Sequence, residues 1–261
     1  MTEASAPREP KTGTRPAGAL NESDASRKVR EMFTQIAPRY DLLNHILSLQ
    51  MDRMWRVRTA KILRPILERA DTKILDLCCG TGDLAFALGR RAKGRVWGAD
   101  FAHTMLVRAR AKGEDASARN KQRVIPFVES DALRLPFADG VFDLVTAAFG
   151  FRNLANYEAG LLEMQRVLKP GGTIAILEFT EPKSGWFGEL YRWYLRAVLP
   201  RLGGLISGDK AAYTYLPKSV ARFFEPEELK ELILKSGYKN VEVRVWTGGT
   251  VALHTGVRVG I

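Results

Sequence analysis

The chain has 261 residues, and the 46% that are hydrophobic are enough to bury one sizeable core, which excludes fibrous and wholly disordered proteins. Its 40 Lys and Arg residues outnumber the 29 Asp and Glu residues, for a formal charge of +11. This excess favours nucleic acid, an acidic substrate or an anionic membrane surface as partner, or marks a protein that is simply basic, and by itself it does not choose among them.

The cysteine pattern points to a reducing compartment. Cys78 and Cys79 are adjacent, and neighbouring cysteines rarely pair with each other. The sequence offers no other cysteine for a disulfide framework or a metal cage, so no metal is expected. No apolar segment of signal-peptide type opens the chain, and no apolar run approaches the roughly 18 residues that cross a bilayer. We therefore expect a cytoplasmic protein, with any membrane contact peripheral, on the inner face of the cytoplasmic membrane.

The N-terminal part is predicted to change from tail to helix. Residues 1–25 are mostly Ala, Pro, Gly, Ser, Thr and charged residues, which bury too little surface to offset the entropy of ordering, so we expect a disordered tail. A single domain is then expected over 26–261. Apolar residues at helical spacing predict a first helix over 29–36, and two more helical stretches are predicted over 41–49 and 52–70.

Strands and helices alternate in the middle of the chain. Short apolar runs predict strands over 73–77, 96–99, 124–129, 142–148 and 173–179, and helical patterns lie between them over 83–92, 102–111 and 158–168. This alternation implies right-handed crossovers, and therefore a Rossmann-like, mostly parallel α/β sheet with helices on both faces. Ligands of such sheets bind at the carboxyl ends of the strands.

The region from about 184 to 223 breaks this rhythm. It is rich in Trp, Tyr, Leu and Arg, and we interpret it as an inserted helical lid. Aromatic residues interleaved with arginines suit a membrane interface, a dimer face or a packed cap, and the sequence leaves all three open. A helix over 225–236 is predicted next, followed by an antiparallel pair of strands over 241–246 and 251–254 that closes the sheet.

The stretch 74–83 carries the sharpest functional signal. Gly80 and Gly82 follow a predicted strand directly and let the backbone turn tightly against a ligand. The pattern also fits a dinucleotide fingerprint, so charge has to decide. Asp76 precedes the loop and Asp83 follows it, although Asp83 could simply cap its helix. Two carboxylates would oppose a pyrophosphate and favour the ammonium and sulfonium charges of S-adenosylmethionine.

Two further acidic residues follow the next predicted strands. Asp100 ends the second strand, where a carboxylate can accept both ribose hydroxyls. Asp131 follows the third strand and is placed to accept the adenine amine, with Ala132 leaving room for the ring. Either carboxylate could instead cap a turn, but three acidic residues at three consecutive strand ends are harder to explain in that way. The expected donor-binding set is Asp76, Gly80, Thr81, Gly82, Asp100, Asp131 and Ala132.

These features resemble class I methyltransferases. More narrowly, the chain resembles the C-methyltransferases of quinone biosynthesis, which comprise the demethylmenaquinone methyltransferases and the 2-methoxy-6-polyprenyl-1,4-benzoquinol methylases. The resemblance runs from about Val29 to the C-terminus, and its specific segments are 40–44, 149–153, 166–172, 178–180 and 248–254. The chain departs from the usual residues at Leu43, Asp52, Cys78 and Thr180, where Met, His, Gly and Ser are common.

The resemblance implies methyl transfer from S-adenosylmethionine to a ring carbon of a polyprenylated quinol, in menaquinone biosynthesis, ubiquinone biosynthesis or both. A ring hydroxyl must lose its proton, so that the phenolate can push electron density onto the neighbouring carbon. We expect Arg152 to stabilise the phenolate and Asn153 to orient the hydroxyl or its water. Alternatively, Arg152 only pairs with a nearby carboxylate and Asn153 only ends its strand. Weaker candidates for proton transfer are Asp209, Tyr213, Tyr215 and His254.

Other functions remain as alternatives. A small-molecule O-methyltransferase or a noncatalytic S-adenosylmethionine-binding protein would share every feature of the donor site. Nucleic acid is not expected as a partner, because the fourth strand ends in Ala-Phe-Gly-Phe rather than the Asn/Asp-Pro-Pro-aromatic motif of enzymes that methylate exocyclic amines. A homodimer is compatible with the sequence.

Overall fold

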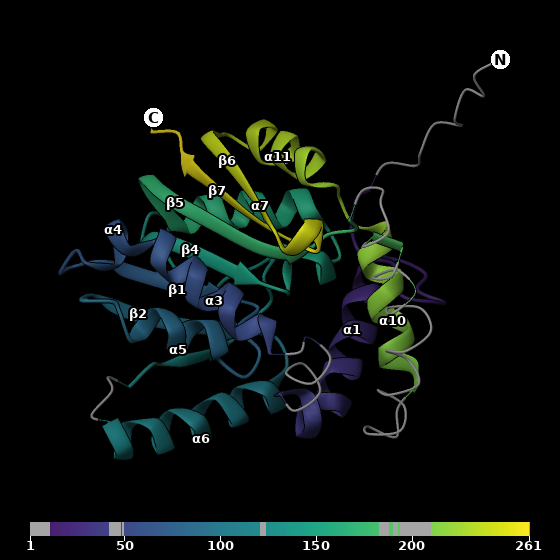
Figure 1. Cartoon of the computed structure of the whole chain (residues 1–261), viewed down its shortest axis with the longest axis horizontal. Helices are drawn as coiled ribbons and strands as arrows, with labels where there is room; N and C mark the ends of the chain where they lie inside the picture. Colours follow the sequence, from purple (N-terminus) through teal and green to yellow (C-terminus); the bar gives the residue numbers. More distant parts are fainter. Residues whose placement is uncertain are drawn as a thin grey trace.

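The structure is a computed structural model that describes residues 11–41, 48, 50–120, 124–182, 188, 189, 193 and 210–260. In this part of the chain, one seven-stranded sheet forms the centre of the molecule (Figure 1). Its order is β3-β2-β1-β4-β5-β7-β6. The strands are β1 (Lys73–Leu77), β2 (Arg95–Asp100), β3 (Phe127–Glu129), β4 (Phe142–Ala148), β5 (Leu168–Phe179), β6 (Tyr238–Trp246) and β7 (Val251–Arg258).

The pairing of the strands confirms the predicted fold class. Strands β1 to β5 pair in parallel, whereas β7 pairs antiparallel with both β5 and β6. The helices of the described residues are α1 (Glu22–Ile36), α3 (Met51–Ile62), α4 (Arg64–Leu67), α5 (Asp83–Gly89), α6 (His103–Asn120), α7 (Tyr157–Val167), α10 (Lys210–Arg222) and α11 (Pro226–Lys235). Short 3₁₀ turns are η1 (Ala37–Arg39), η2 (Phe151–Asn153) and η4 (Thr247–Gly249).

Helices cover both faces of the sheet because successive residues of the central strands point to opposite sides. Ile74 of β1 and Leu144 of β4 are buried against α3, α5 and α6. Their neighbours Leu75 and Val145 are buried on the other face, against α7 and α11. Both sides of β1 and β4 are thus mostly apolar, which makes the loops after the strand ends the main place for polar chemistry (Figure 1).

The N-terminal part is ordered earlier than we expected. Helix α1 begins at Glu22, because the side chain of Asn21 accepts a hydrogen bond from the backbone of Asp24 and caps the helix. Ala25, within the predicted tail, is fully buried. Residues 1–10 of that tail, and most of the helix predicted over 41–49, lie outside the described residues.

Two other predicted helices need comment. The helix predicted over 52–70 is divided into α3 and α4, because Pro65 has no N–H to continue the hydrogen bonding of α3. Of the predicted lid over 184–223, the structure describes residues 188, 189, 193 and 210–223, so the lid as a whole lies outside the described residues. Within the described part of the chain, no helix is both long and apolar enough to cross a membrane.

Candidate active site

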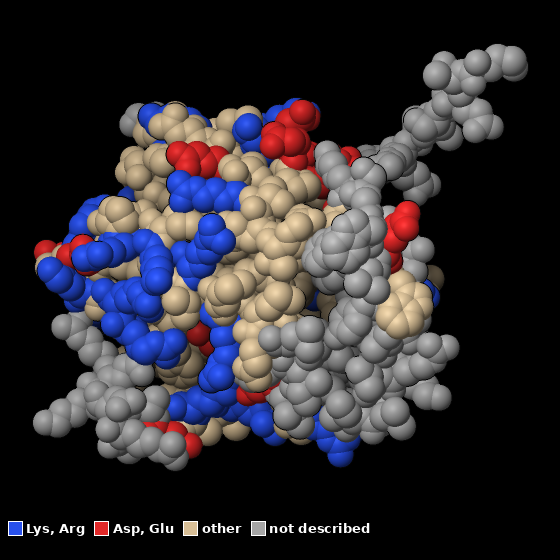
Figure 2. All heavy atoms as spheres, in the orientation of Figure 1, with Lys and Arg blue, Asp and Glu red and all other residues tan. Residues whose placement is uncertain are grey.

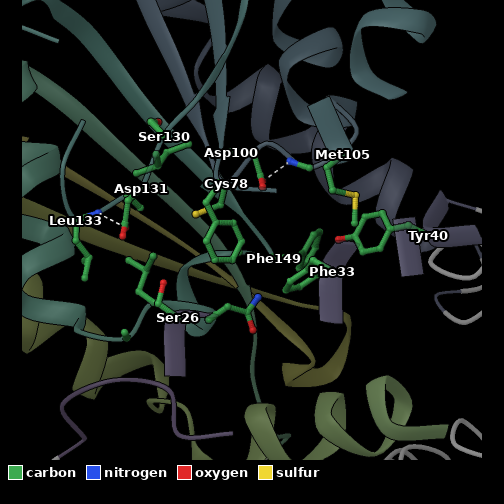
Figure 3. Close-up of a pocket in the computed structure, with 18 residues that line it drawn as sticks. Ser26, Phe33, Tyr40, Cys78, Asp100, Met105, Ser130, Asp131, Leu133 and Phe149 are labelled. Carbon is green, nitrogen blue, oxygen red and sulfur yellow. Dashed lines mark hydrogen bonds between the residues drawn. The ribbon is translucent and has the colours of Figure 1, made fainter. Parts of the chain in front are cut away.

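A pocket lies at the carboxyl ends of β1, β2, β3 and β4, where a parallel sheet is expected to bind ligands (Figure 3). Five of the predicted site residues line it, namely Gly80, Asp100, Asp131, Ala132 and Asn153. Sequence reasoning missed other lining residues, which include Ser26, Phe33, Tyr40, Met105 and Phe149. The apolar members give the pocket walls that can exclude water.

Asp100 is the central carboxylate of this pocket. Its Oδ2 accepts a hydrogen bond from the backbone N–H of Gly80 at 2.9 Å, and its Oδ1 accepts one from Ala102 at 2.9 Å. Burial raises the pKa of Asp100 to about 6, although the backbone hydrogen bonds act in the opposite direction. The side chain is therefore fixed in orientation and sits where β2 ends, in position to accept hydroxyl groups from a ligand.

The loop after β1 has an unusual backbone. Gly80 has a φ of 54° and Gly82 a φ of 85°, in the left-handed region that glycine adopts most readily. Cys78 has a φ of 52°, and Phe149, in the loop after β4, has a φ of 60°. Non-glycine residues in this region cost about 1–3 kcal/mol each and gather at functional sites. A Cβ on Gly150 would lie 2.4 Å from Cys78 Cβ, so the two loops pack too closely for a larger residue there.

Asp131 and Ala132 lie beyond β3 as predicted. The Oδ1 of Asp131 accepts a hydrogen bond from the backbone N–H of Leu133 at 2.9 Å, which holds the carboxylate beside the pocket (Figure 3). The turn-capping role that the sequence left open is thus present, and it is compatible with ligand binding. Ala132 is buried and lines the same wall.

Asp76 and Asp83 do not flank the pocket as open carboxylates. Asp76 is buried, accepts a hydrogen bond from Thr146 Oγ1 at 2.8 Å and lies outside the lining of the pocket. Its burial raises the pKa to about 7. Asp83 forms ion pairs with Lys112 at 2.9 Å and Arg56 at 3.5 Å. The charge argument from the sequence therefore rests on Asp100 and Asp131, because only these two of the four carboxylates line the pocket.

Thr81 and Gly82 belong to the loop after β1 and contact neighbouring elements rather than the pocket. Thr81 is buried, donates a hydrogen bond to Asp41 at 2.5 Å and accepts one from Lys112 at 2.8 Å. A Cβ on Gly82 would lie 2.9 Å from the ring of Phe86. Both residues shape the loop, and neither lines the pocket.

The two predicted catalytic residues take different positions. Asn153 lines the pocket, whereas Arg152 is buried beside it and does not. The guanidinium of Arg152 pairs with Glu178 at 2.8 Å, donates to the carbonyl of Phe149 and lies 5.5 Å from the ring centre of Phe179. The carboxylate pairing that we considered for Arg152 is present. The guanidinium is thus held in place within an ion pair, beside the loop that carries Asn153.

The remaining candidates have structural surroundings. His254 of β7 is buried, and its Nε2 lies 2.8 Å from the carbonyl oxygen of Pro226. Burial lowers the pKa of His254, so the ring is neutral and donates to that carbonyl. Asp52, where relatives commonly have histidine, is buried in an ion pair with Arg56 and accepts a hydrogen bond from Ser48 at 2.6 Å. Asp209 and the side chain of Tyr213 lie outside the described residues.

The strand order, the antiparallel final pair and the carboxylate at the end of β2 define a class I methyltransferase fold. Solved structures share it. The crystal structure of the [4+2]-cyclase SpnF is 16% identical in sequence, with a TM-score of 0.63 over 95% of this chain and 100% of its own. A protein of Thermotoga maritima, described as an S-adenosylmethionine-dependent methyltransferase and possible histamine N-methyltransferase, is 19% identical, with a TM-score of 0.60 over 87% of this chain and 98% of its own. These identities support the fold alone.

Sequence comparison then gives the family. The model of the ubiE/COQ5 methyltransferase family matches residues 21–258, and the chain belongs to this family. A demethylmenaquinone methyltransferase of Thermus thermophilus is 52% identical over 228 residues, which are 87% of this chain and 100% of that protein. Its counterpart in Deinococcus radiodurans is 47% identical over 237 residues, or 90% of this chain and 95% of that protein. The family resemblance inferred from the sequence motifs is confirmed.

Proposed function

We propose that this chain transfers a methyl group from S-adenosylmethionine to a ring carbon of a polyprenylated quinol, with demethylmenaquinol as the acceptor. The observation that carries the proposal is one pocket with Asp100 at its donor end and Asn153, next to the buried Arg152, at its acceptor end. The names of the relatives point to the same substrate class.

The donor end fits S-adenosylmethionine through residues of this chain. Asp100 already accepts hydrogen bonds from two backbone N–H groups. Each of its oxygens keeps a further lone pair that can accept a hydrogen bond from a ribose hydroxyl. Asp131 and Ala132 lie where the adenine would be held. When bound, S-adenosylmethionine supplies a methyl group together with its own leaving group, so the protein contributes alignment and exclusion of water.

The acceptor end provides for the phenolate. The ring hydroxyl gives its proton to a water molecule that relays it to solvent, and Asn153 donates a hydrogen bond to the oxygen that becomes negative. Arg152 adds a positive charge that Glu178 holds in place at 2.8 Å. Such preoriented groups act most strongly where water is excluded, and the bound donor and quinol would exclude it here. The ring carbon next to the phenolate then takes the methyl group as the bond from that group to sulfur breaks, and S-adenosylhomocysteine is left. The same ring carbon afterwards gives its proton to a water molecule, which restores the aromatic ring.

Incubation with methyl-labelled S-adenosylmethionine tests this function. Purified protein should convert reduced demethylmenaquinol, and not the oxidised quinone, to a product with a carbon-bound methyl group, because only the quinol can form a phenolate. A benzoquinol analogue in parallel compares the two branches of quinone biosynthesis. An oxygen-bound methyl group would favour the O-methyltransferase alternative, and donor binding without turnover would favour a noncatalytic protein.

Peripheral contact with an anionic membrane is the second part of the proposal. Lys and Arg side chains gather over α3, α4 and the end of α5 (Figure 2). The exposed members are Arg53, Arg58, Lys61, Arg64, Arg90 and Lys93. Burial and the neighbouring charges of Arg91 and Arg53 lower the pKa of Arg90, so positive charges crowd one another there. An anionic lipid surface would relieve this repulsion and hold the protein where a polyprenyl substrate resides.

Binding to lipid vesicles, measured for charge-reversed variants, tests the surface that these six basic residues form, here called the basic face. Each cationic residue near an anionic membrane contributes about 1 kcal/mol, so changing Arg53, Lys61 and Lys93 to Glu should weaken binding to phosphatidylglycerol vesicles by at least about 100-fold. A control that changes Lys218, Lys235 and Lys239 to Glu has the same net charge and alters other exposed positions. Equal losses in both variants would contradict a specific basic face, and no binding of the wild type at low salt would exclude membrane contact.

A further inference from the structure

A segment that precedes the family-matched region packs against residues that line the acceptor end of the pocket. Residues 11–17, here called the strap, run along residues 154–157, between η2 and the first residue of α7. The backbone N–H of Thr14 donates to the carbonyl of Leu154 at 2.8 Å, and Tyr157 donates to the carbonyl of Thr12 at 2.9 Å. The match to the family begins at residue 21, so the strap lies outside it.

The strap packs closely against its neighbours. A Cβ on Gly13 would lie 1.8 Å from the carbonyl oxygen of Ala155, so only glycine allows this approach. The amine of Lys11 donates to the carbonyl of Phe223 at 2.9 Å and pairs with Glu228 at 2.6 Å. Arg15 donates to the carbonyl of Ala155 at 2.9 Å. The strap thus connects the segment between η2 and α7 with the end of α10 and the first turn of α11.

One side chain of the strap reaches the pocket through a chain of hydrogen bonds. Thr14 is buried, and its Oγ1 lies 2.8 Å from the hydroxyl of Tyr215 on α10. That hydroxyl donates to Oδ1 of Asn153 at 3.0 Å. Because a tyrosine hydroxyl has a single proton, Thr14 must be the donor to Tyr215. Burial raises the pKa of Tyr215, so the hydroxyl keeps its proton.

We propose that Thr14 and Tyr215 are positioning residues that fix the amide of Asn153. Their hydrogen bonds occupy Oδ1, so Asn153 presents its N–H donor group to the acceptor. Without them the amide can rotate and bring its carbonyl oxygen toward the phenolate, which would repel it. The inference rests on the proposed quinol chemistry, and it assigns to the strap a part in aligning the acceptor.

Kinetics of paired variants test this role. Thr14→Val and Tyr215→Phe should each lower kcat for quinol methylation about tenfold and leave the Kd for S-adenosylmethionine unchanged, since the donor end is untouched. Thr14→Ser keeps the hydroxyl and should restore kcat. The double variant should be no slower than Tyr215→Phe, because both changes break one chain of bonds. Ser219→Ala is the matched control, since its hydroxyl bonds Leu216 within α10 at 2.9 Å.

A second measurement reads the positioning without turnover. The side-chain amide NMR signals of Asn153, assigned by their loss in Asn153→Asp, should shift in Thr14→Val and Tyr215→Phe and stay in place in Ser219→Ala. Unchanged signals, or shifted signals with an unchanged kcat in Thr14→Val, would overturn the inference. If the wild type does not methylate the quinol but the Asn153 signals shift in Thr14→Val and Tyr215→Phe as expected, the proposed function is refuted and the chain of hydrogen bonds is still supported.

Discussion

Arg152→Ala should cause the largest loss of stability and turnover of the substitutions considered. Glu178 is fully buried, and without the guanidinium its charge would lose its ion-pair partner. Breaking a buried pair by removing one member costs about 3–5 kcal/mol. At about 2–4 °C per kcal/mol for a domain of this size, Tm should fall by about 10 °C. Turnover should fall by more than the loss of folded protein explains, because the guanidinium proposed to stabilise the phenolate is lost.

A double variant separates the two effects of Arg152. Arg152→Met combined with Glu178→Leu removes both charges, and it should recover much of the stability because no unpaired charge stays buried. Turnover should remain low if the guanidinium stabilises the phenolate, while calorimetry should show unchanged affinity for S-adenosylmethionine. Recovery of turnover along with Tm would show instead that Arg152 serves only the fold.

The sheet could be predicted well because its signals are local. β1 and β4 have the predicted bounds, since each is a short, mostly apolar run that ends at a loop. β3 is shorter than predicted and begins at Phe127, because Pro126 has no N–H to give to the sheet. α1 starts early through a capping residue, Asn21, that composition alone did not reveal.

The candidate site was predictable only where it lies on strand ends. Asp100, Asp131 and Asn153 meet because parallel strands bring their carboxyl ends to one edge of the sheet. The ion-pair partners of Asp83 could not be predicted. Lys112 and Arg56 lie on helices α6 and α3, and the spacing of residues in the sequence does not determine how these helices pack. The same holds for the residues that α1 brings to the pocket and for the hydrogen bonds between the strap and its neighbours, since all of these contacts are tertiary.

Asp100→Asn should cause the largest loss of donor affinity. The asparagine replaces a carboxylate that accepts two backbone N–H groups and, in the complex, the ribose hydroxyls. Hydrogen bonds to a charged group contribute about 1.5–3 kcal/mol each, so the loss of two of moderate strength should raise the Kd for S-adenosylmethionine by at least about 100-fold. Calorimetry measures this directly. Asp131→Asn, at the exposed adenine end, should have a much smaller effect.

The pH dependence of binding identifies Asp100 independently. Burial raises its pKa to about 6, so in the free protein this residue favours folding at low pH, and that contribution is lost as the pH rises through about 6. Ribose hydroxyls need the ionised carboxylate, so donor affinity should rise over the same interval and the shift in Tm caused by the donor should be larger at pH 7.5 than at pH 5. Asp100→Asn should remove this inflection, and Asp131→Asn should keep it. An inflection that persists in Asp100→Asn would assign the titration to another group, with the buried Asp76, whose pKa burial raises to about 7, as the next carboxylate to replace.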